Sequence, residues 1–194
     1  MPQDSARGSG LRHAWIKTAD GTYHDIDAVM SLEGELEIDD TDVEGDDAIL
    51  AKFTSKPTKS ITVGANALTP DVIAAITGRA VTAINVTGPP AVSGEEIGLG
   101  TVNETNPPYV EVGGYTVAKR KSDDAPITIQ RIFHRVQLRM TNPAQEKDSE
   151  FNYELEGVAY PATEDIEGTP LSYERTDTLR FTNEDVDTLI AGQA

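Results

Sequence analysis

The most regular pattern in the sequence is an alternation of apolar and acidic positions. It runs in the order Leu32, Glu33, Gly34, Glu35, Leu36, Glu37, Ile38 and Asp39. A period of two places successive side chains on opposite faces of a β-strand. The pattern therefore predicts a strand with one apolar face and one face of carboxylates.

Short apolar runs separated by turn residues predict more strands. The first two form a hairpin, 14–17 and 22–26, with Asp20-Gly21 in its turn. The others are expected at 48–53, 59–63, 81–86, 98–102, 109–112, 115–117, 127–140, 151–155, 171–173 and 178–181. The Gly- and Pro-rich stretch 79–106 suggests an extended loop or hairpin.

The run 127–140 is the longest of these strand signals, and its apolar positions change phase near Arg131. Such a change predicts a bulge or a twist at that point. Beyond it, Arg135 and Arg139 share the face opposite the apolar one. His134 falls in the apolar phase, where a buried, hydrogen-bonded histidine is expected.

One helix is predicted, at about 70–77. Thr69 is a suitable N-cap, Pro70 fits the first helical position, and Asp71 complements the helix dipole. Gly78 provides the stop. Two turns are too short to be stable alone, so this helix is expected to pack on a sheet.

Together these signals predict a mainly β fold. We expect an antiparallel β-sandwich or barrel with one short flanking α-helix and long loops. Residues 1–12 are interpreted as a flexible arm, 13–182 as a single β-rich domain, and 183–194 as an arm or a short helix.

Composition narrows the functional classes. The 194 residues include 33 acidic and 16 basic side chains, for a formal net charge of −17, which argues against tight binding to nucleic-acid phosphates. There is no cysteine, so thiolate metal sites are excluded. The polar N-terminus resembles no signal peptide, and no apolar run approaches the roughly 20 residues that span a bilayer. A soluble protein made in a cytoplasm, with no membrane partner, is expected.

The sequence offers no recognisable active site. The three histidines are scattered, and no phosphate-binding loop, nucleophile elbow or zinc-protease motif occurs. Carboxylate pairs are too abundant to be diagnostic of acid–base chemistry. We expect no catalytic, cofactor-binding or metal-binding residues, and no enzymatic activity.

The segment 25–51 holds eleven carboxylates and neither Lys nor Arg before Lys52. It fits a solvated strand followed by a loop at 39–47, or a surface that repels or selects a charged partner. The stretch Asp40-Thr-Asp42-Val-Glu44-Gly45 also copies the first half of a calcium loop, but the twelfth position, which needs a carboxylate, is Ala51.

Basic residues concentrate later in the chain. They are Lys119, Arg120, Lys121, Arg131, Arg135 and Arg139. They form either separate solvated faces or a surface that meets the acidic segment of a neighbouring subunit. A head-to-tail contact of that kind generates rings or filaments.

The sequence resembles the major tail tube protein of long-tailed (siphovirus-type) bacteriophages over roughly residues 15–181. The similarity lies in the acidic strand followed by Val43-Glu-Gly-Asp-Asp47, in the helix segment Leu68–Gly78, in Pro107–Gly114, and in the strand pair around 127–155. The resemblance implies a β-sandwich or barrel subunit. Six such subunits would close a ring, and rings would stack into a tube with an electronegative bore through which DNA passes.

The resemblance also suggests roles for the acidic segment. Glu33, Glu35 and Glu37 are expected to face the bore. The following residues are expected to reach a neighbouring subunit or ring: Asp39, Asp40, Asp42, Glu44, Asp46 and Asp47. The implied partners are other copies of the chain, the tail tip or initiator, the tape measure, and the terminator. The implied location is the virion, after assembly in the host bacterial cytoplasm. The alternative is another β-rich virion component, such as a tail terminator or a head–tail connector.

Overall fold

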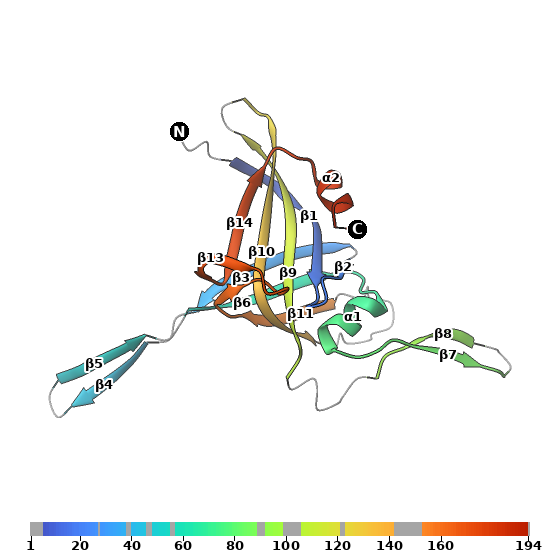
Figure 1. Cartoon of the computed structure of the whole chain (residues 1–194), viewed down its shortest axis with the longest axis horizontal. Coiled ribbons are helices and arrows are strands. Elements are labelled where there is room, and N and C mark those ends of the chain that lie inside the picture. Colours follow the sequence, from blue (N-terminus) through green and yellow to red (C-terminus); the bar gives the residue numbers. More distant parts are fainter. Residues whose placement is uncertain are drawn as a thin grey trace.

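The computed structural model describes residues 6–26, 28–37, 40–45, 48–54, 57–88, 92–98, 106–120, 123–141 and 153–193. Within these ranges, eight strands form one antiparallel sheet (Figure 1). They are β1 (Ala6–Lys17), β2 (Tyr23–Ile26), β3 (Val29–Glu37), β6 (Thr58–Ala65), β9 (Tyr109–Arg120), β10 (Pro126–Thr141), β11 (Tyr153–Ala159) and β14 (Asp177–Thr182). The predicted mainly β, antiparallel class is confirmed.

The remaining described elements are three two-stranded ribbons and two short helices. The ribbons are β4 (Asp40–Gly45) with β5 (Ala48–Thr54), β7 (Thr82–Val86) with β8 (Val92–Glu96), and β12 (Ala162–Glu164) with β13 (Pro170–Arg175). The helices are α1 (Pro70–Thr77) and α2 (Val186–Ala191).

The sheet follows the order β2-β1-β9-β10-β11-β6-β3 and folds back on itself. Figure 1 shows β3 and β6 running across the long strands β9 and β10. Gly34 of β3 packs so closely on β10 that an added Cβ would lie 2.7 Å from Cζ of Phe133. The result is a two-layered sandwich with its core between the layers.

Strand β10 holds the two halves of the sheet together. One edge pairs with β9, whereas the other edge is shared by β14, opposite residues 128–133, and β11, opposite residues 136–141. The main core contains buried side chains from both layers, including Ile16, Val63, Val112, Phe133 and Leu155.

Helix α1 forms where the sequence predicts it. The Thr69 hydroxyl accepts a hydrogen bond from the Val72 amide at 3.3 Å, and Gly78 ends the helix with φ of 66°. Val72 and Ile76 are buried in the main core, so the helix packs on the sheet as expected.

The phase change in β10 lies later than predicted. Ile132 belongs to a small cluster with Trp15 and Tyr115, whereas Phe133 and Val136 both belong to the main core. The register with β9 shifts between Phe133 and Val136. The bulge is therefore at 134–135, not near Arg131, because Arg131 and Phe133 remain on one face.

The segment 39–47 was expected to be a loop, and this interpretation is wrong for residues 40–45. They form strand β4, which pairs with β5 in a ribbon that projects away from the sandwich (Figure 1). Such a strand does not have the loop conformation of a calcium site. The ribbon β7–β8 also projects, and its second strand is 92–96. The strand predicted at 98–102 lies, beyond Gly98, outside the described residues.

The N-terminal segment differs from the predicted arm, whereas the C-terminal segment follows one of its two predicted alternatives. Strand β1 begins at Ala6, within the predicted arm, because β9 supplies backbone partners as far as Arg120. Gly10, with φ of 106°, permits the irregular register there. Of the two alternatives for 183–194, residues 186–191 form the short helix.

Candidate functional site: a carboxylate face

The outward face of strands β3, β6 and β11 carries acidic side chains on the two outer strands and hydroxyl side chains on β6 between them. Thr62 of β6 lies directly opposite Glu33 of β3 on one side and Glu156 of β11 on the other. Directly opposed residues in an antiparallel sheet point to the same face. By the same register and alternation, five exposed glutamates share this surface, the carboxylate face: Glu33, Glu35, Glu37, Glu154 and Glu156.

The β6 hydroxyls separate the two acidic strands. Ser60 stands opposite Glu35 and donates a hydrogen bond to the Glu37 carboxylate. Because β3 and β11 are two strand spacings apart, their carboxylates lie about 10 Å from each other across the sheet. That is about one Debye length at physiological salt, so repulsion is modest while the surface potential remains negative.

The carboxylate face ends at β10, where the charge changes sign. Arg139 is opposite Glu156 in the register, and both line a hollow of about 560 Å³ with Thr62 and Tyr160. Farther along β10, the Arg135 guanidinium lies 4.1 Å from the ring centre of Tyr109, a cation–π contact.

The predicted basic residues do not form one surface. Arg139 and Arg135 follow the bulge and face outward with the carboxylate face. Arg131 precedes the bulge and lies on the inner-layer side, where it contacts Phe133 and Asp177. The bulge at 134–135 reverses the side-chain phase, so Arg131 lies on the face of β10 opposite to Arg135 and Arg139.

The second basic group lies at the far end of β9. Arg120 bonds to Asp123 at 3.4 Å and donates to the Asn183 side chain at 2.7 Å, and Lys119 beside it is exposed. Four residues of the predicted contact set lie outside the described residues: Asp39, Asp46, Asp47 and Lys121. Asp40, Asp42 and Glu44 belong to β4.

Asp177 anchors the start of β14 through two cations. Its carboxylate accepts from Lys59 Nζ at 2.6 Å and lies 3.4 Å from Arg131. Partial burial raises the pKa of Asp177, but the hydrogen bond from Lys59 and the charges of Lys59 and Arg131 outweigh burial and hold the pKa below its ordinary value. No local pattern connects Lys59 with Asp177, so sequence reasoning missed this group.

His134 is buried and hydrogen-bonded, as predicted. The imidazole is 2% exposed, and its Nδ1 lies 3.0 Å from the Glu111 carboxylate. Its Nε2 lies 2.6 Å from the Thr178 hydroxyl. The adjacent residues 177 and 178 are thus each fixed by a polar contact from the sandwich.

In the described ranges, no group of three or more His, Asp or Glu side chains is arranged to hold a metal ion. No helix among the same residues has the length and apolar character needed to cross a membrane. The chain matches no protein-family profile and no curated protein sequence.

Sequence reasoning missed two of the five glutamates, Glu154 and Glu156. They alternate with Tyr153 and Leu155, so the local signal for an acidic strand face was present. What the sequence did not contain is the order of strands, which brings β11 beside β6 and thereby joins the two acidic strands into one surface.

Proposed function

We propose that this chain is a structural subunit of a bacteriophage tail tube. Six copies close into a ring, and stacked rings enclose a bore lined by the carboxylate face. The observation that carries the proposal is that surface: five exposed glutamates on β3 and β11, with only hydroxyl side chains and small residues between them at Thr62 and Ser60.

A negative wall suits a DNA conduit. Duplex DNA binds proteins largely by exchanging condensed counterions for Lys and Arg, so a surface of carboxylates offers it no such exchange. DNA passing along this bore is repelled from the wall and does not stick. The wall therefore does not bind the passing DNA, and binding would stall it.

The sheet also has surfaces suited to joining copies. Among the described residues, β3 pairs with β6 alone and β14 pairs with β10 alone, so each leaves one backbone edge without a strand partner. Open edges are hazardous in a monomer and are satisfied when subunits pair. Head-to-tail contacts between unlike surfaces close into rings.

In this proposal the partners are other copies of the chain and the tail tip or initiator, tape measure and terminator proteins. The site of action is the virion, and assembly takes place in the host cytoplasm. The proposed role is structural and involves no catalysis, cofactor or membrane.

Electron microscopy of the purified protein tests the proposal. We expect negatively stained samples at high concentration, or with the tail-tip initiator added, to contain rings and tubes. Single closed rings that never stack would instead support a tail terminator or connector. Dispersed monomers under both conditions would contradict the tail-tube proposal.

A further inference from the structure

Strand β14 carries a strip of large apolar side chains that the described chain leaves uncovered. Leu179 is 55% exposed and Phe181 is 60% exposed, and alternation places both on the face of β14 that also holds Asp177. They stand opposite Arg131 and Ile129 of β10 in the register.

The strip continues onto β3. Leu36, which is 53% exposed, lines a hollow of about 230 Å³ together with Arg175 and Asp177. We call Leu36, Leu179 and Phe181 the β14 strip. Contiguous exposed apolar side chains of this size mark interaction surfaces in soluble proteins.

The backbone beside the strip is also open. Within the described residues β14 bonds to β10 along one edge, and no strand pairs with its other edge. An open edge next to an apolar face accepts an extended segment, which gains main-chain hydrogen bonds and apolar contacts together.

The β4–β5 ribbon is the segment of this chain that needs such a surface. Its two strands contact each other, and the ribbon projects from the sandwich (Figure 1). A two-stranded ribbon is marginally stable in water without a surface to pack on. The β5 sequence, Ala-Ile-Leu-Ala-Lys-Phe-Thr, supplies the apolar residues for that packing.

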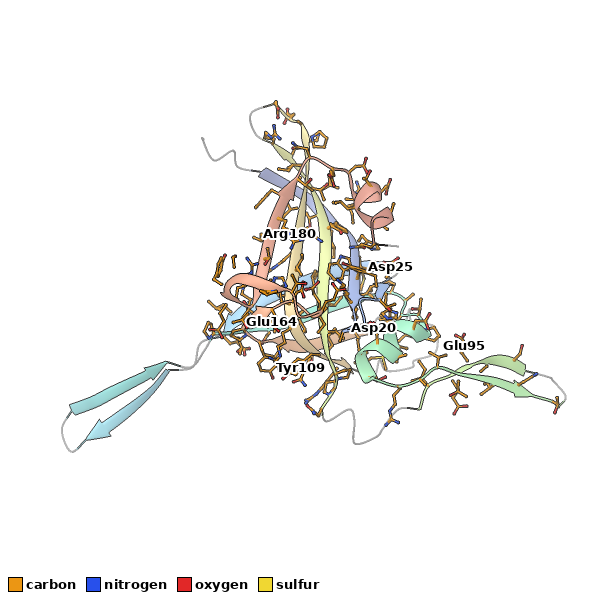
Figure 2. All side chains as sticks on the ribbon, viewed as in Figure 1. Asp20, Asp25, Glu95, Tyr109, Glu164 and Arg180 are labelled. Carbon is orange, nitrogen blue, oxygen red and sulfur yellow. The ribbon has the colours of Figure 1, made fainter. Side chains whose placement is uncertain are left out.

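Charge supports the same pairing. Arg180, which Figure 2 labels on β14, alternates onto the other face of the strand and does not border the strip. Three basic side chains border the strip, namely Lys59, Arg131 and Arg175, against two acidic ones, Glu174 and Asp177. In a chain of net charge −17 this is a locally positive surface, and β4 (DTDVEG) brings three carboxylates and no cation.

We propose that the β4–β5 ribbon of one copy docks on the β14 strip of a second copy, with β5 over Leu179 and Phe181. This inference rests on the proposed function, since it names the joint through which copies of the chain associate.

Disulfide trapping tests the contact directly, because the natural chain has no cysteine. Phe181→Cys protein is mixed with Ile49→Cys, Leu50→Cys or Phe53→Cys protein and oxidised. A cross-linked heterodimer is expected with at least one β5 position. Met30→Cys, at a residue 51% exposed on β3 and outside the strip, replaces Phe181→Cys as the matched control.

The outcomes separate the inference from the proposed function. Cross-links no stronger than the Met30→Cys background overturn the docking site, whether or not wild-type tubes form. Cross-links above that background in a sample without tubes support the joint and contradict the tail-tube function.

A second variant pair measures the strip's contribution to assembly. Phe181→Glu should raise the protein concentration needed for assembly roughly tenfold or more, because it removes apolar burial and adds repulsion. Met30→Glu should leave that concentration unchanged. Equal effects of the two substitutions would also overturn the docking site.

Discussion

At the scale of single residues, the buried ring of Trp15 leaves no room for a side chain at position 113. The indole is 1% exposed and lies over the backbone of β9. A Cβ added to Gly113 would sit 2.2 Å from Cζ2 of the Trp15 ring. A buried ring cannot move aside cheaply in a close-packed interior.

We therefore expect Gly113→Ala to lower the free energy of unfolding by about 1–3 kcal/mol or more through overpacking. Gly94→Ala is the matched control, because its Cβ would meet nothing closer than 3.9 Å on the exposed ribbon. Urea denaturation followed by circular dichroism measures both. Equal midpoints for the two variants would contradict the close approach of Trp15.

Asp177 makes the stability of the start of β14 depend on pH. Its pKa is depressed in the folded protein, so the carboxylate contributes stability above its ordinary unfolded value of 3.8. That contribution is lost as the pH falls through the lower folded value.

Asp177→Asn should accordingly lower the free energy of unfolding by about 1–2 kcal/mol at neutral pH, a figure discounted for solvent screening. The difference from wild type should shrink as the pH is lowered below about 4. Chemical denaturation at pH 7, 5 and 3 gives the three differences. Glu164→Gln, at an exposed position, is the control and should stay within about 0.5 kcal/mol of wild type. A difference that does not change with pH would contradict the role of the Asp177 carboxylate.

At the scale of elements, α2 is a short helix that covers an aromatic cluster. Val186, Leu189 and Ile190 pack against Trp15, Tyr115 and Ile132. The Gln193 side chain, just beyond the helix, donates to the Tyr115 hydroxyl at 2.7 Å. The helix therefore shields the only tryptophan of the chain from solvent on this side.

Leu189→Asp should detach α2, because it places a charge against the apolar cluster. Trp15 fluorescence should then shift to longer wavelength and become more sensitive to acrylamide quenching. Ala191→Ser, on the exposed side of the same helix, should leave the spectrum unchanged. An unaltered spectrum in Leu189→Asp, with the variant still folded by circular dichroism, would show that α2 does not shield the indole.

Elements whose signals are local were predicted well from sequence. The hairpin 14–26, the capped helix α1 and the acidic strand β3 each depend on neighbouring residues. The β4 strand was mistaken for a loop because its run of aspartates carries no apolar alternation. The bulge of β10 was predicted near Arg131 but lies at 134–135, because its position depends on pairing with β9, which no local pattern reveals.

At the scale of the whole molecule, the order of strands converts two separate acidic strands into one surface. Glu33, Glu35 and Glu37 come from β3, whereas Glu154 and Glu156 come from β11 more than a hundred residues later. The charge of this surface is what the proposed conduit depends on.

A triple substitution of Glu33, Glu35 and Glu37 by lysine should make the surface bind DNA. If three phosphates are contacted, affinity should fall roughly 40-fold between 50 and 200 mM salt. Substituting the same residues by glutamine is the control and should give far weaker retention, as should wild type. Gel-shift titration at both salt concentrations measures this. Indifference of the lysine variant to DNA would mean that this surface is not accessible to a duplex.

The pairing of β10 also sets an order of events during synthesis. The first half of its second edge is covered by β14, which follows every other strand of the sheet in the sequence. On the ribosome, β10 therefore presents an unpaired edge until residues 177–182 have emerged. Unpaired edges join other chains readily. A nascent copy is consequently prone to premature association until β14 has been made and covers this edge of β10.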